Sequence, residues 1–263
     1  MQSELKVLNW DLGIEDEKIV LMPLSDLHIG SNFNEDLFLK YRKWVLSQKN
    51  AYVLLNGDIV EMVTKDSVGD IFESLRPKEQ KKLAVKFLEP LAKEGRLLAY
   101  VDGNHEHRLS KNTDIFVGEE ICERLGVPSI YDPNGVYIFL TMGYEAKHNK
   151  NTRITYTIYM RHGHGGGRTK GAKANNLEKM SNKIFADIFI SSHVHEQMNF
   201  PDVFTVPDPI HKKLNYIDSW FVSSGSFLNW SGYAIRGGYN PTKLGSSYLI
   251  LNGRRKGVQI VSG

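Results

Sequence analysis

The stretch Ile19–Ser25, IVLMPLS, which runs directly into Asp26-Leu27-His28, decides the fold. A short apolar run that ends in polar residues is typical of a buried strand in an α/β sheet. A second run, Ala51–Leu55, leads into Asn56-Gly57-Asp58, and a third, Arg96–Val101, leads into another polar motif. Because ligands bind beyond the carboxyl ends of the strands in such sheets, these runs predict one shared site at one edge.

Polar motifs rich in His and Asp follow the predicted strands along most of the chain. Crowded carboxylates and imidazoles repel one another or bury uncompensated charge, so few soluble proteins gather them without using them. Carboxylate, amide and imidazole groups together are the ligands of divalent transition metals. The motifs therefore predict a hydrolase with two metal ions side by side. They are Asp26-Leu27-His28, Gly57-Asp58, Gly103-Asn104-His105-Glu106, Arg161-His162-Gly163-His164 and His193-Val194-His195.

The composition is that of an ordinary soluble globular protein. The 263 residues are 41% hydrophobic and 24% charged, with a net charge of +3, and they suffice for one large domain or two modest ones. The single cysteine, Cys122, excludes an internal disulfide framework and a thiolate zinc site, and we expect it to be buried in a helix. Residues 1–13 lack a continuous apolar stretch, and no run reaches the roughly 20 apolar residues that span a bilayer. We therefore expect a cytoplasmic protein without a membrane partner.

Strand and helix signals alternate in the first half of the chain, and strands dominate after Pro128. This order predicts two sheets packed together, with helices outside. We expect helices over Asn34–Gln48, Pro77–Glu94 and Ile115–Leu125, and a β-hairpin insertion around 136–161 that pairs Val136–Leu140 with Ile154–Met160. Further strands are expected at Ala186–Ser191, Val203–Val206, Ile217–Ser223, Ser246–Leu251 and Gly257–Val261.

In this order, each behind a strand, the motifs resemble those of the calcineurin-like metallophosphoesterase superfamily. The resemblance runs from Asp26 to His195 and continues loosely to Ser226. It implies a four-layer α/β/β/α sandwich of two mixed β-sheets flanked by helices, formed by a single domain over 1–263. It also implies two divalent cations as cofactors, with Mn²⁺ preferred and Fe, Zn²⁺ or Ni²⁺ accepted by the same ligands.

Carried over position by position, the resemblance implies two sets of ligands that share Asp58. A shared carboxylate lets two cations approach to about 3.5–4 Å, lowers the pKa of a bridging water and clamps the phosphate oxygens. The resemblance makes His105 the catalytic residue, which stabilises the transition state or protonates the leaving alkoxide. Glu106 would orient His105 or a ligand. One ion would be held by Asp26, His28, Asp58 and His195, and the second by Asp58, Asn104, His162 and His193.

A basic block surrounds the fourth motif. Residues 146–177 contain seven basic residues and no Asp or Glu. Arg168, Lys170 and Lys173 follow the glycine-rich stretch at once, so we expect them to lie within reach of an anionic substrate. Arg108 is a candidate phosphate contact, with a surface salt bridge as an equally frequent alternative.

The fourth motif offers two imidazoles to one metal. We favour His162 as the ligand because it directly ends the strand, and we place His164 among the substrate contacts. Farther along, Trp230, Tyr233 and Tyr239 lie in a glycine-rich segment. Such aromatic residues can stack on a nucleobase, although core packing of the second sheet is the more frequent explanation.

These features favour a phosphodiesterase or nuclease that acts on nucleic acid or nucleotides. A phosphomonoesterase of proteins or small molecules is the alternative, and a non-catalytic scaffold of the same fold is the less favoured one. Val101-Asp102 stands where protein phosphatases of the superfamily carry an arginine, and Gly57-Asp58-Ile59-Val60 departs from their second motif. Both departures disfavour a protein phosphatase. The sequence indicates no oligomeric state.

Overall fold

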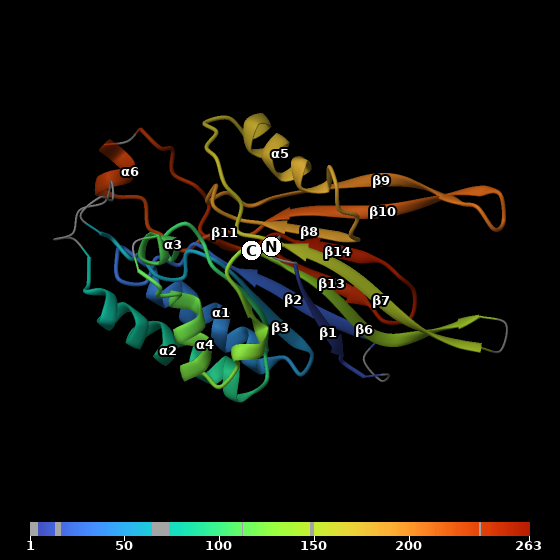
Figure 1. Cartoon of the computed structure of the whole chain (residues 1–263), viewed down its shortest axis with the longest axis horizontal. Helices are drawn as coiled ribbons and strands as arrows, with labels where there is room; N and C mark the ends of the chain where they lie inside the picture. Colours follow the sequence, from blue (N-terminus) through green and yellow to red (C-terminus); the bar gives the residue numbers. More distant parts are fainter. Residues whose placement is uncertain (1–4, 14–16, 65–73, 112, 148–149, 237) are drawn as a thin grey trace.

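Two six-stranded mixed β-sheets pack face to face, with helices on their outer faces (Figure 1). The computed structural model describes residues 5–13, 17–64, 74–111, 113–147, 150–236 and 238–263. The expected α/β class, with two mixed sheets flanked by helices, is confirmed. The single-domain organisation stays a prediction.

The first three of the five motifs follow strands of the first sheet. Its strand order is β14-β13-β2-β3-β4-β5. The strands β2 to β5 run parallel, and the register pairs Leu24 with Leu55 and Leu55 with Tyr100. The carboxyl ends of β2, β3 and β4 are therefore level, so the residues that follow them meet. The bounds are β2 Lys18–Leu24, β3 Ala51–Asn56, β4 Leu97–Val101, β5 Tyr131–Asp132, β13 Tyr248–Asn252 and β14 Val258–Val261.

Three amphipathic helices cover the outer face of this sheet: α1 (Glu35–Ser47), α2 (Pro77–Lys93) and α4 (Val117–Arg124). As expected, α1 begins at an Asn34 cap, whose side chain accepts a hydrogen bond from the Leu37 N–H at 3.1 Å. Each helix buries one apolar face, exemplified by Phe38, Leu88 and Ile121. Cys122 is buried, as predicted. Burying a large apolar side chain such as Phe38, Leu88 or Ile121 contributes about 1.5–3 kcal/mol to the free energy of folding.

The second sheet has the order β1-β6-β7-β8-β10-β9. The predicted hairpin forms, since β6 and β7 pair antiparallel. Both strands lie inside the sheet, between β1 and β8, so the hairpin supplies two of its inner strands. Helix α5 covers this sheet on the side away from the first one (Figure 1), over the stacked rings of Phe189 and Phe221. The bounds are β1 Lys6–Asp11, β6 Val136–Lys147, β7 Lys150–Met160, α5 Lys170–Glu178, β8 Ile188–Ser191, β9 Met198–Asp208 and β10 Lys213–Ser223.

Apolar side chains from both sheets fill the layer between them. Leu54 of the first sheet and Ile138, Ile158 and Val222 of the second are fully buried in one cluster. None of the helices in the part of the chain that the structure describes is long and apolar enough to cross a membrane. The smaller elements are α3 His107–Ser110, α6 Gly232–Arg236, the 3-10 turns Pro128–Ile130 and Lys179–Ser181, and the paired strands β11 Gly225–Ser226 and β12 Gly245–Ser246.

Candidate metal centre

Loops from both sheets meet at the carboxyl edge of β2 and β3. The Asp26 N–H donates to the Gly57 carbonyl and the His28 N–H to the Asp58 carbonyl, each at 3.0 Å. A Cβ atom at Gly57 would lie 2.6 Å from both the Gly103 nitrogen and His162 Nδ1, so only glycine fits between these loops. The Gly-Asp motif is thus required by close packing as well as by chemistry.

Five of the seven predicted ligands have a left-handed backbone. Asp26, His28, Asp58, His193 and His195 have φ between 49° and 71°. This region is costly for residues with a Cβ, and such conformations persist where the surrounding structure enforces them. Here the costly conformations coincide with the crowded polar groups, which is the pattern of a functional site.

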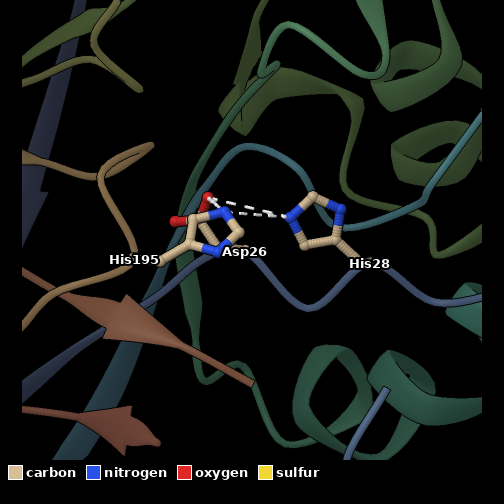
Figure 2. A group of neighbouring side chains, drawn as sticks. All are labelled: Asp26, His28 and His195. Carbon is tan, nitrogen blue, oxygen red and sulfur yellow. Dashed lines mark hydrogen bonds and ion pairs between the residues drawn. The ribbon is translucent and has the colours of Figure 1, made fainter. Parts of the chain in front are cut away.

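Asp26, His28 and His195 form the first cluster (Figure 2). His195 Nε2 lies 3.1 Å from Asp26 Oδ1 and 3.3 Å from His28 Nε2. The other Asp26 oxygen, Oδ2, accepts hydrogen bonds from the Ser25 hydroxyl and the His193 N–H. One carboxylate oxygen is therefore fixed by the fold, and the other faces the two imidazoles.

Asp58, His162 and His193 form the second cluster. His162 Nε2 lies 3.2 Å from Asp58 Oδ2, and Asn104 Oδ1 lies 2.8 Å from His193 Nδ1. His162 Nδ1 donates to the Asn56 carbonyl at 2.7 Å, which leaves Nε2 directed at the cluster. All seven predicted ligands are thus brought together, three around Asp26 and four around Asp58.

Asp58, a member of the second cluster, also faces the first one. Its Oδ1 accepts the His105 N–H at 2.9 Å. Its Oδ2 faces His162 at 3.2 Å and lies 4.0 Å from His28 Nε2. One oxygen of Asp58 is therefore within reach of both ligand sets.

Glu106 holds the loops together. Its buried carboxylate accepts hydrogen bonds from four backbone N–H groups, at distances between 2.7 and 3.1 Å. Three donors follow β3 (Asp58, Ile59 and Val60), and the fourth is Gly103 after β4. Glu106 therefore orients the backbone that presents Asp58 and Asn104.

Glu61 is a functional residue that the sequence reasoning missed. Its Oε2 accepts a hydrogen bond from His28 Nδ1 at 2.8 Å, which directs His28 Nε2 at Asp26. His105 Nδ1 donates to the Glu61 carbonyl, also at 2.8 Å. Burial raises the pKa of Glu61, but the hydrogen bonds from His105 and His28 outweigh it and lower that pKa. Its signal was a carboxylate three residues after Asp58.

The clusters concentrate negative charge in a buried place. Burial alone would raise the pKa of Asp26, yet His195 brings it down to about 2. Burial likewise opposes ionisation of Asp58, but His162 lowers its pKa well below the usual range. In return, Asp58 raises the pKa of His162 to about 10 against the effect of burial. The two buried carboxylates stay ionised and demand positive charge nearby.

The donor set fits divalent cations. Asp26 Oδ1 and His162 Nε2 are buried and make no well-aligned hydrogen bond among the described residues, although His195 Nε2 and Asp58 Oδ2 lie 3.1 and 3.2 Å from them. Buried polar atoms without a partner are uncommon and call for an explanation such as a bound ion. One lies in each cluster, and the carboxylate, amide and imidazole donors are those of Mn²⁺, Fe, Zn²⁺ and Ni²⁺.

A cavity of about 1490 Å³ opens above the clusters. Among the predicted substrate contacts, Arg108, Arg168 and Lys170 line it. Arg108 Nη2 lies 3.0 Å from His105 Nε2, and Arg108 Nη1 lies 3.5 Å from Glu61 Oε1. Arg108 thus makes an ion pair and also lines the cavity. His164 is exposed and lines a separate small pocket next to α5.

The basic block is partly neutralised by Glu196, which the sequence reasoning also missed. Lys173 Nζ lies 2.7 Å from Glu196 Oε2, and Lys170 Nζ lies 3.6 Å from Oε1. The Lys173 side chain is 14% exposed and that of Lys170 is 85% exposed. Lys173 therefore fastens α5 to the loop of His195, whereas Lys170 remains at the rim of the cavity.

The core-packing interpretation of the aromatic segment is wrong for Trp230 and Tyr239. Both side chains line the cavity, exposed to 46% and 55%. Their loop lies between β11 and β12, which form a two-stranded sheet separate from the second six-stranded one. The side chain of Tyr233 lies outside the described residues.

Comparisons with known proteins bear on the family of the chain. The family model of calcineurin-like phosphoesterases matches residues 21–197, which include all five motifs. No curated protein matches the chain. A crystal structure from Streptococcus pneumoniae TIGR4, titled a conserved uncharacterized protein and predicted phosphoesterase, is similar at 13% identity and a TM-score of 0.38, over 93% of this chain and 90% of that one. Because the family model matches residues 21–197, which is most of its length, the chain belongs to the calcineurin-like phosphoesterase family.

Proposed function

We propose that this chain is a phosphodiesterase of nucleic acid or nucleotides, with two divalent cations, Mn²⁺ first, held side by side. The observation that carries the proposal is the position of Asp58 Oδ2, which faces His162 at 3.2 Å and His28 at 4.0 Å. One ion would be held by Asp26, His28, Asp58 and His195, and the other by Asp58, Asn104, His162 and His193. When bound, such a pair supplies Lewis-acid activation of water and of the phosphate ester.

We assign to His105 the protonation of the leaving group. The Glu61 carbonyl fixes Nδ1, so Nε2 is the nitrogen left to act, beside Arg108 in the cavity. In this geometry Arg108 Nη2 donates to Nε2, so Nε2 can carry a proton to the departing oxygen once Arg108 has turned to a phosphate oxygen.

A diester is favoured over a monoester by the size and charge of the cavity. Its volume of about 1490 Å³ exceeds the 300–1,000 Å³ typical of small-molecule sites. Arg168 and Lys170 line it beyond the clusters, where neighbouring phosphates of a polymer would pass. Both features support a polyanionic substrate.

Hydrolysis of bis-p-nitrophenyl phosphate and of p-nitrophenyl phosphate with Mn²⁺ tests the proposal. We expect the diester to be the better substrate by kcat/KM. Replacing His105 by Ala should lower kcat on the diester about 100-fold or more, with metal content nearly intact. Better turnover of the monoester would favour a phosphomonoesterase, and bound metal without turnover of either ester would favour a scaffold.

A further inference from the structure

One wall of the cavity carries two large aromatic side chains. Trp230 and Tyr239 are exposed to 46% and 55% although both are large enough to fill a core. They line the same cavity as His28, Asp58 and His105. Aromatic rings in a groove with positive charge are the groups on which unpaired nucleobases stack.

The aromatic wall is tied to the first metal-ligand motif. The Phe227 N–H donates to the Asp26 carbonyl at 3.0 Å, and the Asn229 N–H donates to the Asn32 carbonyl at 2.9 Å. The Asn32 side chain in turn donates to the Ser231 hydroxyl at 2.6 Å. The segment before and after Trp230 is therefore fixed to the loop that carries Asp26 and His28.

The indole ring is also held from its own loop. Trp230 Nε1 donates to the Tyr239 carbonyl at 2.7 Å, which joins the two ends of the segment. A ring held in place before binding loses little freedom when a ligand stacks on it. This arrangement suits recognition better than core packing, because the Trp230 side chain lines the cavity and is 46% exposed.

Arg168 supplies positive charge next to this wall. A Cβ atom at Gly238 would lie 3.8 Å from Arg168 Nη1, so the guanidinium reaches the residue before Tyr239. Lys170, which begins α5, lines the same cavity and is 85% exposed. Aromatic rings flanked by Arg and Lys match the alternation of bases and phosphates along one strand.

We propose that Trp230 and Tyr239 form a subsite for an unpaired nucleobase of single-stranded DNA or RNA, whose backbone passes Arg168 and Lys170 toward the metal clusters. The inference rests on the proposed phosphodiesterase function and narrows its substrate. A base inside a duplex is stacked on its neighbours and cannot lie on the indole, so the subsite selects single strands or flipped bases.

Fluorescence anisotropy of a labelled single-stranded oligonucleotide with cleavage-resistant phosphorothioate linkages, measured with Mn²⁺ present, tests the subsite. Replacing Trp230 by Ala should weaken binding about 10-fold, whereas Trp230→Phe should stay within about 3-fold of the wild type. An oligonucleotide with abasic residues should bind the wild type and Trp230→Ala with equal affinity. Tyr216→Ala is the matched control, because Tyr216 is 71% exposed on β10 outside the cavity.

Equal binding of the wild type and Trp230→Ala, or an equal loss with the abasic strand, would overturn the subsite. If Trp230→Ala fails to fold, Tyr239→Ala replaces it with the same expected loss. Diester turnover separates the two proposals. A wild type that binds bases but hydrolyses no diester refutes the phosphodiesterase and keeps the subsite. If the wild type and Trp230→Ala hydrolyse single strands at the same rate, the phosphodiesterase stands and the subsite is refuted.

Discussion

Replacing Glu106 by Gln should destabilise the metal centre and the fold together. The Glu106 carboxylate accepts two N–H bonds on each oxygen, from Asp58 and Gly103 on Oε2 and from Ile59 and Val60 on Oε1. An amide keeps one oxygen and turns the other into a donor, so two buried N–H groups lose their acceptor. Each unsatisfied group costs about 1–3 kcal/mol, or about 2–6 kcal/mol for the pair.

One effect opposes this loss. Burial and the neighbouring Asp58 raise the pKa of Glu106, so removing its charge relieves part of the unfavourable burial. We therefore expect the lower half of the range, about 2–4 kcal/mol. At about 2–4 °C per kcal/mol for a chain of this size, the Tm should fall by about 4–16 °C.

Urea denaturation and thermal unfolding measure the stability, and elemental analysis after loading with Mn²⁺ measures metal content. The control is Glu123→Gln, on the exposed side of α4, which should stay within about 0.5 kcal/mol of the wild type. A Glu106→Gln chain with wild-type Tm and metal content would refute the role of Glu106 as the clamp of these loops.

Three further changes probe the site. Gly103→Ala places a Cβ against Asp58 Oδ1 and should abolish metal loading, measured by elemental analysis, whereas Gly166→Ala has open space and should load normally. Glu61→Ala removes the acceptor of His28 Nδ1 and should weaken metal affinity about 10- to 100-fold in chelator competition. Replacing Arg168 and Lys170 by Gln should flatten the slope of log(kcat/KM) for a single strand against log(salt) by about 1.4, because each lost phosphate contact removes about 0.7.

Each of these has an outcome that contradicts it. Normal metal loading of Gly103→Ala would mean that the two loops can separate without consequence. Unchanged chelator competition would remove Glu61 from the support of His28. An unchanged salt slope would show that Arg168 and Lys170 contact no phosphate; Lys40 and Lys43, exposed on α1, provide the double control.

The strands and helices that carry the motifs follow from sequence because local signals agree with the fold there. The Asn34 cap and Pro77 mark their helices to within one residue. The strand β9 was predicted too short, as Val203–Val206 instead of Met198–Asp208. Pro201 and Pro207 signal strand ends, but β9 is an edge strand, where proline is tolerated.

The positions of Glu61 and Trp230 could not be predicted in the same way. Glu61 reaches His28 because the backbone after β3 turns through a left-handed Asp58 and Met62, which no local pattern announces. Trp230 faces the cavity because its loop is hydrogen-bonded to Asn32, about 200 residues earlier in the chain. Both depend on tertiary contacts between distant segments rather than on periodicity.

Anomalous diffraction at the manganese edge from crystals grown with Mn²⁺ tests the central claim most directly. The account predicts two peaks about 3.5–4 Å apart, one on each side of Asp58 Oδ2. A single peak, or a pair of peaks that does not share Asp58, would contradict it.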